Sequence, residues 1–398
     1  MNEEPIFTPE QFRAQAVELS QAVAELHRRD SQRIDPHDPF ENETEFHDYQ
    51  SDYAEIVPQI RIPGCRIPLR ANSREKSRIR RFYNIVGGFM LLHLICSNVI
   101  AVGLEWLILA LLRMSDSAMT AQLPTNYTEL AIDYMENSST ILALNILAMG
   151  VTSTALALLG LRMTKISVPS LFRTKKFDGI TAFSYITIII LLQCVCGYAA
   201  VGLRELFDGV GVTLYEPDIS MGQDLKTTIL SLIYGVIVAP FTEELLMRGF
   251  VQKNLSRVSQ RFGIVMTAFL FGLWHENVAQ FVLAFVGGLF FGYIAAKHDS
   301  LMPSMICHMA VNLVAEIGSL FEERGWETAM TVLDCIYFGL ALVGLVMLIR
   351  LLIVERFPRT TPHQAERGLR QAFASPLLMA VCASHIAVMV ALIVQKTK

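Results

Sequence analysis

Long apolar runs, each bounded by polar or charged residues, dominate this sequence of 398 residues. A helix needs about 20 apolar residues to cross a hydrocarbon core of roughly 30 Å, and most of the runs reach that length. The run 262–275 has 14 residues and would reach only about 21 Å, so we expect it to form a recessed hairpin with 278–296. The runs occupy 82–112, 140–161, 179–203, 227–247, 262–275, 278–296, 300–320, 328–352 and 375–394.

The composition agrees with a chain that lies mostly in lipid. Hydrophobic residues make up 53% and charged residues 18%, against about 25% charged in average soluble domains. These values exclude a soluble globular protein, a disordered chain, a collagen and a coiled coil. The seven cysteines form no CxxC pair, so they indicate neither a disulfide framework nor a zinc site. We predict an all-α fold, a polytopic membrane helical bundle of about eight to nine spans.

Charge is distributed unevenly along the chain. Residues 1–60 hold 14 Asp and Glu against 4 Lys and Arg, whereas residues 61–81 hold 8 Lys and Arg against one Glu. We interpret the first stretch as a flexible acidic arm with one amphipathic helix, and the second as a basic collar. We divide the chain into this cytoplasmic arm with its collar, N-terminal membrane helices, core helices and C-terminal membrane helices, at 1–80, 82–203, 225–320 and 328–398.

The connections between the runs differ in basic residues. If the N-terminus is cytoplasmic and the runs alternate, the cytoplasmic segments hold 23 Lys and Arg and the opposite segments hold 5. The positive-inside rule therefore predicts a multi-pass membrane protein with a cytoplasmic N-terminus. The segments assigned to the cytoplasm are 61–81, 162–178, 248–261, 297–299 and 350–370.

Ionisable side chains within or beside the apolar runs are the first candidates for a functional site, because each costs several kcal/mol in lipid. Most of them stand alone in the sequence. We interpret His93, Glu105, Asp334 and His385 as interhelical hydrogen-bond partners or near-interface residues. The full set is His93, Glu105, Glu243, Glu244, Arg248, His275, Glu276, His308, Glu316, Asp334 and His385.

Two adjacent acids open the one dense cluster, at 240–312. Glu244 and Arg248 are four residues apart, with the acid N-terminal, which is the favourable order for a pair on one helix face. Glu243 lies about 100° round the helix and lacks that partner. One acid can thus be held by Arg248 while the other is free for proton transfer. Pro240 removes a backbone donor and should loosen the helix just before these acids.

Two further motifs carry histidines. Phe271 and His275 share a helix face, and so do His308 and Asn312. Counted from Lys253, Arg261 and Asp299, which are assigned to the cytoplasmic side, the side chains of Glu243, His275 and His308 lie about 13–21 Å above the cytoplasmic boundary. We expect them to converge in a water-filled pocket that opens to the cytoplasm, and a purely structural polar network is the alternative.

With these motifs the sequence resembles the CPBP family of intramembrane proteases, which includes CAAX prenyl endopeptidases and bacteriocin-processing enzymes. The family shows Glu-Glu-x-x-x-Arg, Phe-x-x-x-His and His-x-x-x-Asn/Asp on successive membrane helices. Here these are Glu243-Glu244 with Arg248, Phe271 with His275, and His308 with Asn312. The resemblance covers about 225–320 and implies an intramembrane endopeptidase.

The resemblance also implies a role for each residue. Glu243 would activate a water that His275 helps to hold, and His308 and Asn312 would donate to the oxyanion. Glu244 and Arg248 would support them. We expect no cofactor, although Glu and two His are also a catalytic zinc set, so a zinc metalloprotease stays an alternative. No Ser or Cys is suitably paired with either histidine, which disfavours a covalent mechanism.

The expected partners are the lipid bilayer and a peptide or lipidated protein substrate, with no nucleic acid. A transporter or a non-catalytic scaffold that uses the same buried polar cluster is the alternative, but the chain lacks the repeat symmetry typical of transporters. The bacterial plasma membrane and the endoplasmic reticulum both remain open. We favour a bacterial cell membrane, because most stand-alone membrane proteases of this type resemble bacterial ones.

Overall fold

The computed structural model describes most of the chain beyond the N-terminal arm. The described residues are 17, 18, 21, 73–116, 139–174, 177–214, 225–355, 357 and 366–397. They are largely helical and include no β-strand, and eight of their helices are long and apolar enough to cross a membrane. The predicted fold class is confirmed. The flexible arm, by contrast, was predicted for residues that lie almost entirely outside the described ranges.

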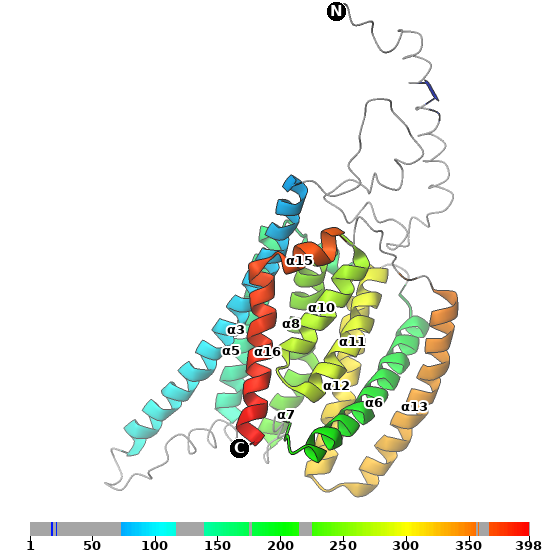
Figure 1. Cartoon of the computed structure of the whole chain (residues 1–398). Helices are drawn as coiled ribbons and strands as arrows, with labels where there is room; N and C mark the ends of the chain where they lie inside the picture. Colours follow the sequence, from blue (N-terminus) through cyan, green and yellow to red (C-terminus); the bar gives the residue numbers. More distant parts are fainter. Residues whose placement is uncertain are drawn as a thin grey trace, which may run out of the picture.

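The helices follow the apolar runs in order (Figure 1). One continuous helix, Leu225–Leu255, contains five labelled pieces that alternate between α-helical and π-helical turns. The outer and core helices are α3 (Ser73–Asp116), α5 (Ser139–Met163), α6 (Gly179–Gly209), α10 (Gln260–Trp274), α11 (Val278–Lys297), α12 (Met302–Glu323), α13 (Glu327–Val354) and α16 (Pro376–Thr397). We call the continuous helix Leu225–Leu255 the broken helix, because its turns change between the α and the π type. It comprises α7 (Leu225–Ile233), η4 (Tyr234–Val238), α8 (Ala239–Glu244), η5 (Leu245–Gln252) and α9 (Lys253–Leu255).

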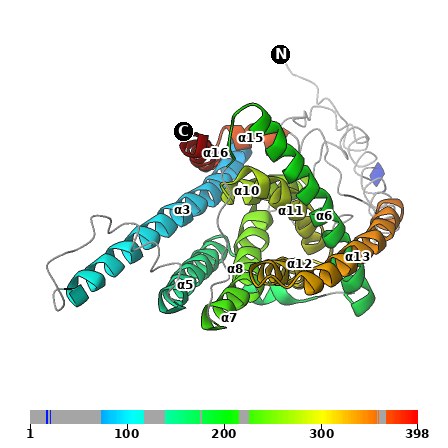
Figure 2. The ribbon, with the colours of Figure 1, turned by 90° about the horizontal axis from the view of Figure 1, so that it is seen from below.

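The broken helix lies in the middle of the bundle. Seen along the bundle in Figure 2, α3 and α5 lie on one side and α6 and α13 on the other, with α7, α8, α10, α11 and α12 between them. α10 packs against α11 along its length, and α16 packs against α3. α10 has 15 residues, so it extends about 22 Å and is too short to span. The predicted hairpin of 262–275 with 278–296 is confirmed as this α10–α11 pair.

Glycines allow two of the helix pairs to approach closely. A Cβ atom at Gly344 of α13 would overlap the backbone carbonyl of Thr187 in α6, and one at Gly87 of α3 would overlap the backbone at Leu377 of α16. Membrane helices associate through such small residues, because lipid gives them no hydrophobic drive to pair. At these two glycines the backbone of α13 therefore contacts that of α6, and the backbone of α3 contacts that of α16.

The basic connections meet at one end of the bundle. Arg257, after α9, donates to the carbonyl of Thr164 after α5 at 2.7 Å. Lys297, at the end of α11, forms an ion pair with Glu355 after α13. Segments that the charge pattern assigned to one side of the membrane are thus in contact. That this side is the cytoplasm stays a prediction.

Pro240 coincides with a change in the helix that carries the two acids. The five residues Tyr234–Val238 form a π-helical turn directly before Ala239 and Pro240. A proline provides no N–H for the preceding turn, and the wider π turn accommodates this loss. The predicted loosening before the acids is therefore present, and it leaves the carbonyl of Gly235 available to another helix.

Candidate active site

A buried ion pair lies at the centre of the broken helix. Arg248 Nη1 donates to Glu244 Oε1 at 2.7 Å, and both side chains are buried. Arg248 Nη2 lies 3.5 Å from the carbonyl of Gly288 on α11, and the guanidinium lies 4.4 Å from the ring centroid of Phe271 on α10. Buried charges are tolerated only when they are paired and hydrogen-bonded in this way. The pairing predicted from the four-residue spacing is confirmed.

His308 of α12 lies between the two adjacent acids. Its Nδ1–H donates to Glu244 Oε1 at 3.0 Å, and its Nε2 lies 3.7 Å from Glu243 Oε2. The Glu244 side chain is 0% exposed, whereas that of Glu243 is 22% exposed. Adjacent residues therefore have different surroundings: Glu244 is held by Arg248 and His308, and Glu243 is the acid that solvent can reach.

The ring of Phe271 brings the two histidines together. His275 packs edge-on against it with the ring centroids 4.9 Å apart, and His308 packs edge-on from another side at 6.0 Å. Phe291 of α11 stacks on His308 at 4.9 Å and lies 5.3 Å from the Arg248 guanidinium. Phe271 therefore contacts both histidines and Glu243 lies beside His308, whereas the water-filled pocket that opens to the cytoplasm stays a prediction.

His275 is oriented by the end of its own helix. α10 ends at Trp274 and His275 is its C-cap residue. The Nδ1–H of His275 donates to the carbonyl of Phe271 at 2.8 Å. A neutral imidazole with its proton on Nδ1 has a lone pair on Nε2. His275 can therefore accept a hydrogen bond from a water or a substrate at Nε2.

The turn that carries His275 is held by helices from both ends of the chain. Glu276 has a left-handed φ of 54°, and its Oε1 accepts from Nδ1–H of His385 in α16 at 2.8 Å. Such a backbone conformation is unfavourable for a residue with a Cβ unless the surrounding structure fixes it. The bond to His385, 109 residues away in sequence, is such a constraint.

The other neighbour of His275 is held in a similar manner. Trp274 packs edge-on against His93 of α3 at 4.8 Å, and His93 Nε2 is hydrogen-bonded to Ser153 Oγ of α5 at 2.9 Å. His93 and His385 are therefore interhelical partners, as predicted from their isolation in the sequence. Helices α3, α5 and α16 thus support the turn that carries His275.

Asn312 lies one helical turn after His308 on α12. Its Nδ2 donates to the carbonyl of Gly235 in the π-helical turn at 2.7 Å. A side-chain amide has two N–H donors, so this bond leaves one of them for a ligand. This hydrogen bond joins α12 to the π-helical turn of the broken helix.

The arrangement of donors bears on the zinc alternative. A catalytic zinc usually has three protein ligands at about 2.0–2.2 Å. Among the residues that the structure describes, no three His, Cys, Asp or Glu side chains are placed to hold one metal ion. The Nδ1 atom of His275 is hydrogen-bonded to the carbonyl of Phe271, and that of His308 is hydrogen-bonded to the carboxylate of Glu244. The metal-free mechanism stays a prediction that chelation tests.

Comparison with known proteins adds a family to this geometry. Residues 225–314 match the family model for the Rce1-like type II CAAX prenyl endopeptidases. The matched residues form a CAAX prenyl endopeptidase domain. Glu243, Glu244, Arg248, His275, His308 and Asn312 all lie within this endopeptidase domain. No curated protein and no solved structure matched the chain.

The domain gives the protein its general activity. CAAX prenyl endopeptidases are proteases, and the described residues of this chain include eight helices long and apolar enough to span a membrane. The protein is therefore an integral membrane protein and an intramembrane endopeptidase. Helices α3, α5, α6, α13 and α16 lie outside the matched domain.

Sequence reasoning missed several partners of the endopeptidase site. Phe291 lies in a run of apolar residues on α11, and nothing in that run distinguishes it from its neighbours. The backbone carbonyls of Gly288 and Gly235 accept from Arg248 and Asn312, and no side chain marks them. By contrast, His93, Glu276 and His385 could be recognised in the sequence, because each is an ionisable residue within or beside an apolar run.

Proposed function

We propose that this endopeptidase hydrolyses a peptide bond in a membrane-associated or lipidated substrate, with a water activated by Glu243. The observation that carries the proposal is the asymmetry of the two acids. Glu244 is buried and bound to Arg248 and His308, while Glu243 is partly exposed and 3.7 Å from His308 Nε2. A general base must reach water, and Glu243 is the acid of the pair that does.

In the proposed reaction Glu243 takes a proton from water as the water oxygen attacks the carbonyl carbon of the scissile bond. The carbonyl oxygen becomes an oxyanion. The C–N bond then breaks, and the proton held by Glu243 passes to the leaving amine. The products are a carboxylic acid and an amine, which exchange a proton to become a carboxylate and an ammonium, so one water is consumed for each bond. His275 orients the water through its free Nε2.

The oxyanion requires hydrogen-bond donors that are already in place. Asn312 has one N–H left after its bond to Gly235, and His308 can donate from Nε2 when it carries a second proton. Glu243, at 3.7 Å from that nitrogen, is close enough to exchange a proton with it through a small movement. Glu244, which is itself held by Arg248, accepts from the other nitrogen of His308 and so fixes the ring.

The family match and the position of the site support a lipidated substrate. The matched family is named for prenyl endopeptidases of CAAX sequences. The two acids lie within the broken helix Leu225–Leu255, which is one of the candidate membrane spans. A substrate with a prenyl group partitions into the bilayer and brings its peptide to that depth. A leader peptide and a transmembrane segment are the other candidates.

Cleavage by the purified protein tests the proposal directly. The probes are a farnesylated CAAX peptide and the same peptide without the lipid, and the products are measured by mass spectrometry. We expect wild-type protein to cut the farnesylated peptide and Glu243→Ala to leave it intact. Equal activity of Glu243→Ala would contradict the assignment of the base. Cleavage of the unlipidated peptide at the same rate would contradict the substrate class.

A further inference from the structure

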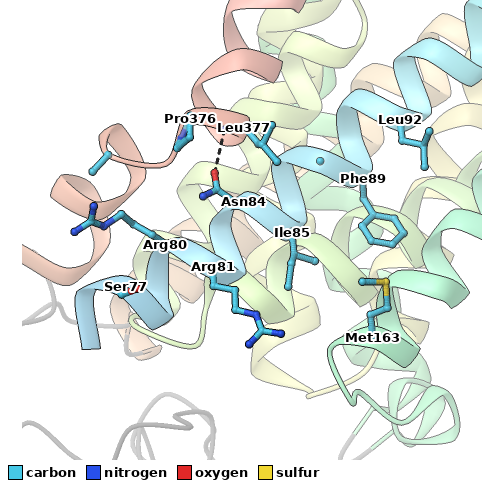
Figure 3. Close-up of a pocket in the computed structure, with 12 residues that line it drawn as sticks. Ser77, Arg80, Arg81, Asn84, Ile85, Phe89, Leu92, Met163, Pro376 and Leu377 are labelled. Atoms are coloured by element: carbon cyan, nitrogen blue, oxygen red, sulfur yellow. Dashed lines mark hydrogen bonds between the residues drawn. The ribbon is translucent and has the colours of Figure 1, made fainter. Parts of the chain in front are cut away.

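A groove of about 760 Å³ lies outside the endopeptidase domain, between α3, α5 and the start of α16 (Figure 3). Its walls come mainly from the first turns of α3, and Met163 and Leu377 close it on either side. Figure 3 shows Arg80 and Arg81 toward one end and Leu92 at the other. The groove is therefore basic at one end and apolar along its length.

The groove lies where three membrane spans end at the same level. The span in α3 begins at Lys76, the span in α5 ends at Met163, and α16 begins at Pro376. Side chains from all three positions or their immediate neighbours line the groove. The basic end is thus at a membrane interface, and the apolar part runs from it into the bilayer.

The basic end presents two neighbouring guanidinium groups. Arg80 Nε is buried and has no hydrogen-bond partner among the described residues, and Arg81 is exposed. A guanidinium binds phosphate and carboxylate through two parallel N–H donors, and a buried donor without an acceptor is unfavourable. Figure 3 shows the two side chains pointing to different sides of α3, so an anionic group bound here has the buried Nε–H of Arg80 as one donor and the exposed Arg81 as a second donor that turns toward it.

The apolar part has the length and form of a hydrocarbon chain. Ile85, Phe89 and Leu92 follow the two arginines along one side of α3, and Leu92 lies about 18 Å beyond Arg80 by the helical rise. Gly88 leaves the groove open between them, since a Cβ there would meet only the side chain of Leu377, at 3.4 Å. Phe89 is 8% exposed and Leu92 is 42% exposed, so the groove opens toward lipid as it leaves the interface.

We propose that this groove binds one anionic glycerophospholipid. Its phosphate pairs with Arg80 and Arg81, and one acyl chain runs along Ile85, Gly88 and Leu92. Charge complementarity and position argue for this occupant: basic pockets between membrane helices at an interface fit anionic headgroups, and a phospholipid carries its phosphate and its chain at these two depths. The bound lipid would join α3 to α16, the helices that hold the turn of His275.

Binding can be measured without using the protease activity. Full-length protein is purified in detergent and titrated with phosphatidylglycerol, and lipid retention is followed by native mass spectrometry and by the melting temperature. We expect saturable one-to-one binding that raises the melting temperature, because a ligand that binds only the folded state stabilises it. Removing both charges in R80Q/R81Q should weaken the affinity about 30-fold.

A further variant tests the part of the groove that would hold the acyl chain, and another serves as a control. Gly88→Leu fills the apolar part and keeps both arginines, and it should weaken lipid binding while the apo protein melts as the wild type does. Arg78→Gln removes an exposed charge on the same helix outside the groove and should bind phosphatidylglycerol as the wild type does. This control distinguishes the groove from a general attraction to the basic collar.

Specific results would overturn the proposal. Phosphatidylcholine binding with equal affinity would show that the arginines do not select an anion. Inorganic phosphate that produces the whole stabilisation would make this a free phosphate site. Displacement of the lipid by a farnesylated peptide would identify the groove as part of the substrate path. Unchanged binding in both R80Q/R81Q and Gly88→Leu would place the lipid elsewhere.

Discussion

Glu243 and Glu244 are neighbours in the chain and have different partners. Glu244 accepts from Arg248 and His308 within a fully buried network, and Glu243 has the access to solvent that a base requires. The helix creates this difference, because consecutive side chains point about 100° apart. One side chain faces the packed core and the next faces the space beside His308.

The first prediction concerns these two acids. Glu243→Gln keeps the shape of the side chain and removes the base, so we expect it to abolish turnover while folding and substrate binding stay near normal. Glu244→Gln leaves Arg248 buried without its counter-charge, which should cost about 3–5 kcal/mol of stability. Peptide cleavage, substrate affinity and detergent melting are measured for both. A stable Glu244→Gln without activity, beside an active Glu243→Gln, would reverse the assignment.

The second prediction concerns the oxyanion and a metal ion together. If Asn312 donates to the oxyanion, Asn312→Ala should lower kcat by about 10²–10³ with little change in KM. If zinc were the catalyst, His275→Ala and His308→Ala would lose bound metal and chelators would stop the wild type. We expect active protein to lack stoichiometric zinc by elemental analysis and to survive prolonged chelation. Loss of activity on chelation, restored by zinc, would refute the metal-free mechanism.

At the level of helices, the turn between α10 and α11 links the site to the outer helices. His275 lies between Trp274, which packs on His93 of α3, and Glu276, which binds His385 of α16. The short α10 helix cannot fix its own end across the membrane. The outer helices supply that support, although they lie outside the matched endopeptidase domain.

The third prediction tests this support. Glu276→Ala removes the bond to His385 and leaves the left-handed backbone in place, so His275 should lose its fixed orientation. We expect kcat to fall at least about tenfold with KM little changed, as for a misplaced catalytic group. Glu276→Gln can still accept from His385 and should retain most of the activity. Equal losses in both variants would contradict a positioning role.

The fourth prediction concerns the packing of α13 on α6. Gly344→Ala places a Cβ on the backbone carbonyl of Thr187, so α13 must move away from α6. Overpacking of this kind costs about 1–3 kcal/mol. Gly339→Ala on the same helix is the control, because a Cβ there meets nothing within 4 Å. Melting in detergent should show a loss for Gly344→Ala alone, and equal melting of the two variants would contradict the close approach.

Across the whole molecule, the basic connections gather at one end of the bundle. Arg257 reaches Thr164, and Lys297 pairs with Glu355, across segments far apart in sequence. The same end holds the basic first turn of α3 and the groove with Arg80. The positive-inside rule then predicts that this end faces the cytoplasm.

The fifth prediction tests that orientation. A reporter or a single accessible cysteine at residue 125, which lies outside the described residues, should report the outer side of the membrane. The same probe at Ser170, which is exposed after α5, should report the inner side. The distribution of 23 against 5 basic residues is the physical basis. The opposite pattern would put the basic end and its groove on the outer face.

Features that depend on local order along the chain could be predicted from the sequence. Apolar runs long enough for a bilayer fixed the helices, because backbone groups in lipid must be satisfied within a helix. The four-residue spacing determined the Glu244–Arg248 pair, and the family resemblance located all six candidate site residues. Even the short run 262–275 was recognisable as a recessed helix from its length.

The tertiary structure alone decided which side chains meet across helices. That His308 contacts both acids, that Phe291 stacks on it, and that His385 holds Glu276 depend on how helices far apart in sequence turn toward one another. Helical periodicity gives the faces of one helix and carries no information about the rotation of its neighbours. Backbone acceptors such as the carbonyl of Gly235 cannot be predicted from the sequence, because every residue has a carbonyl group. The rotation of each helix was set by packing, and packing gave Glu243 its access and Glu244 its partners.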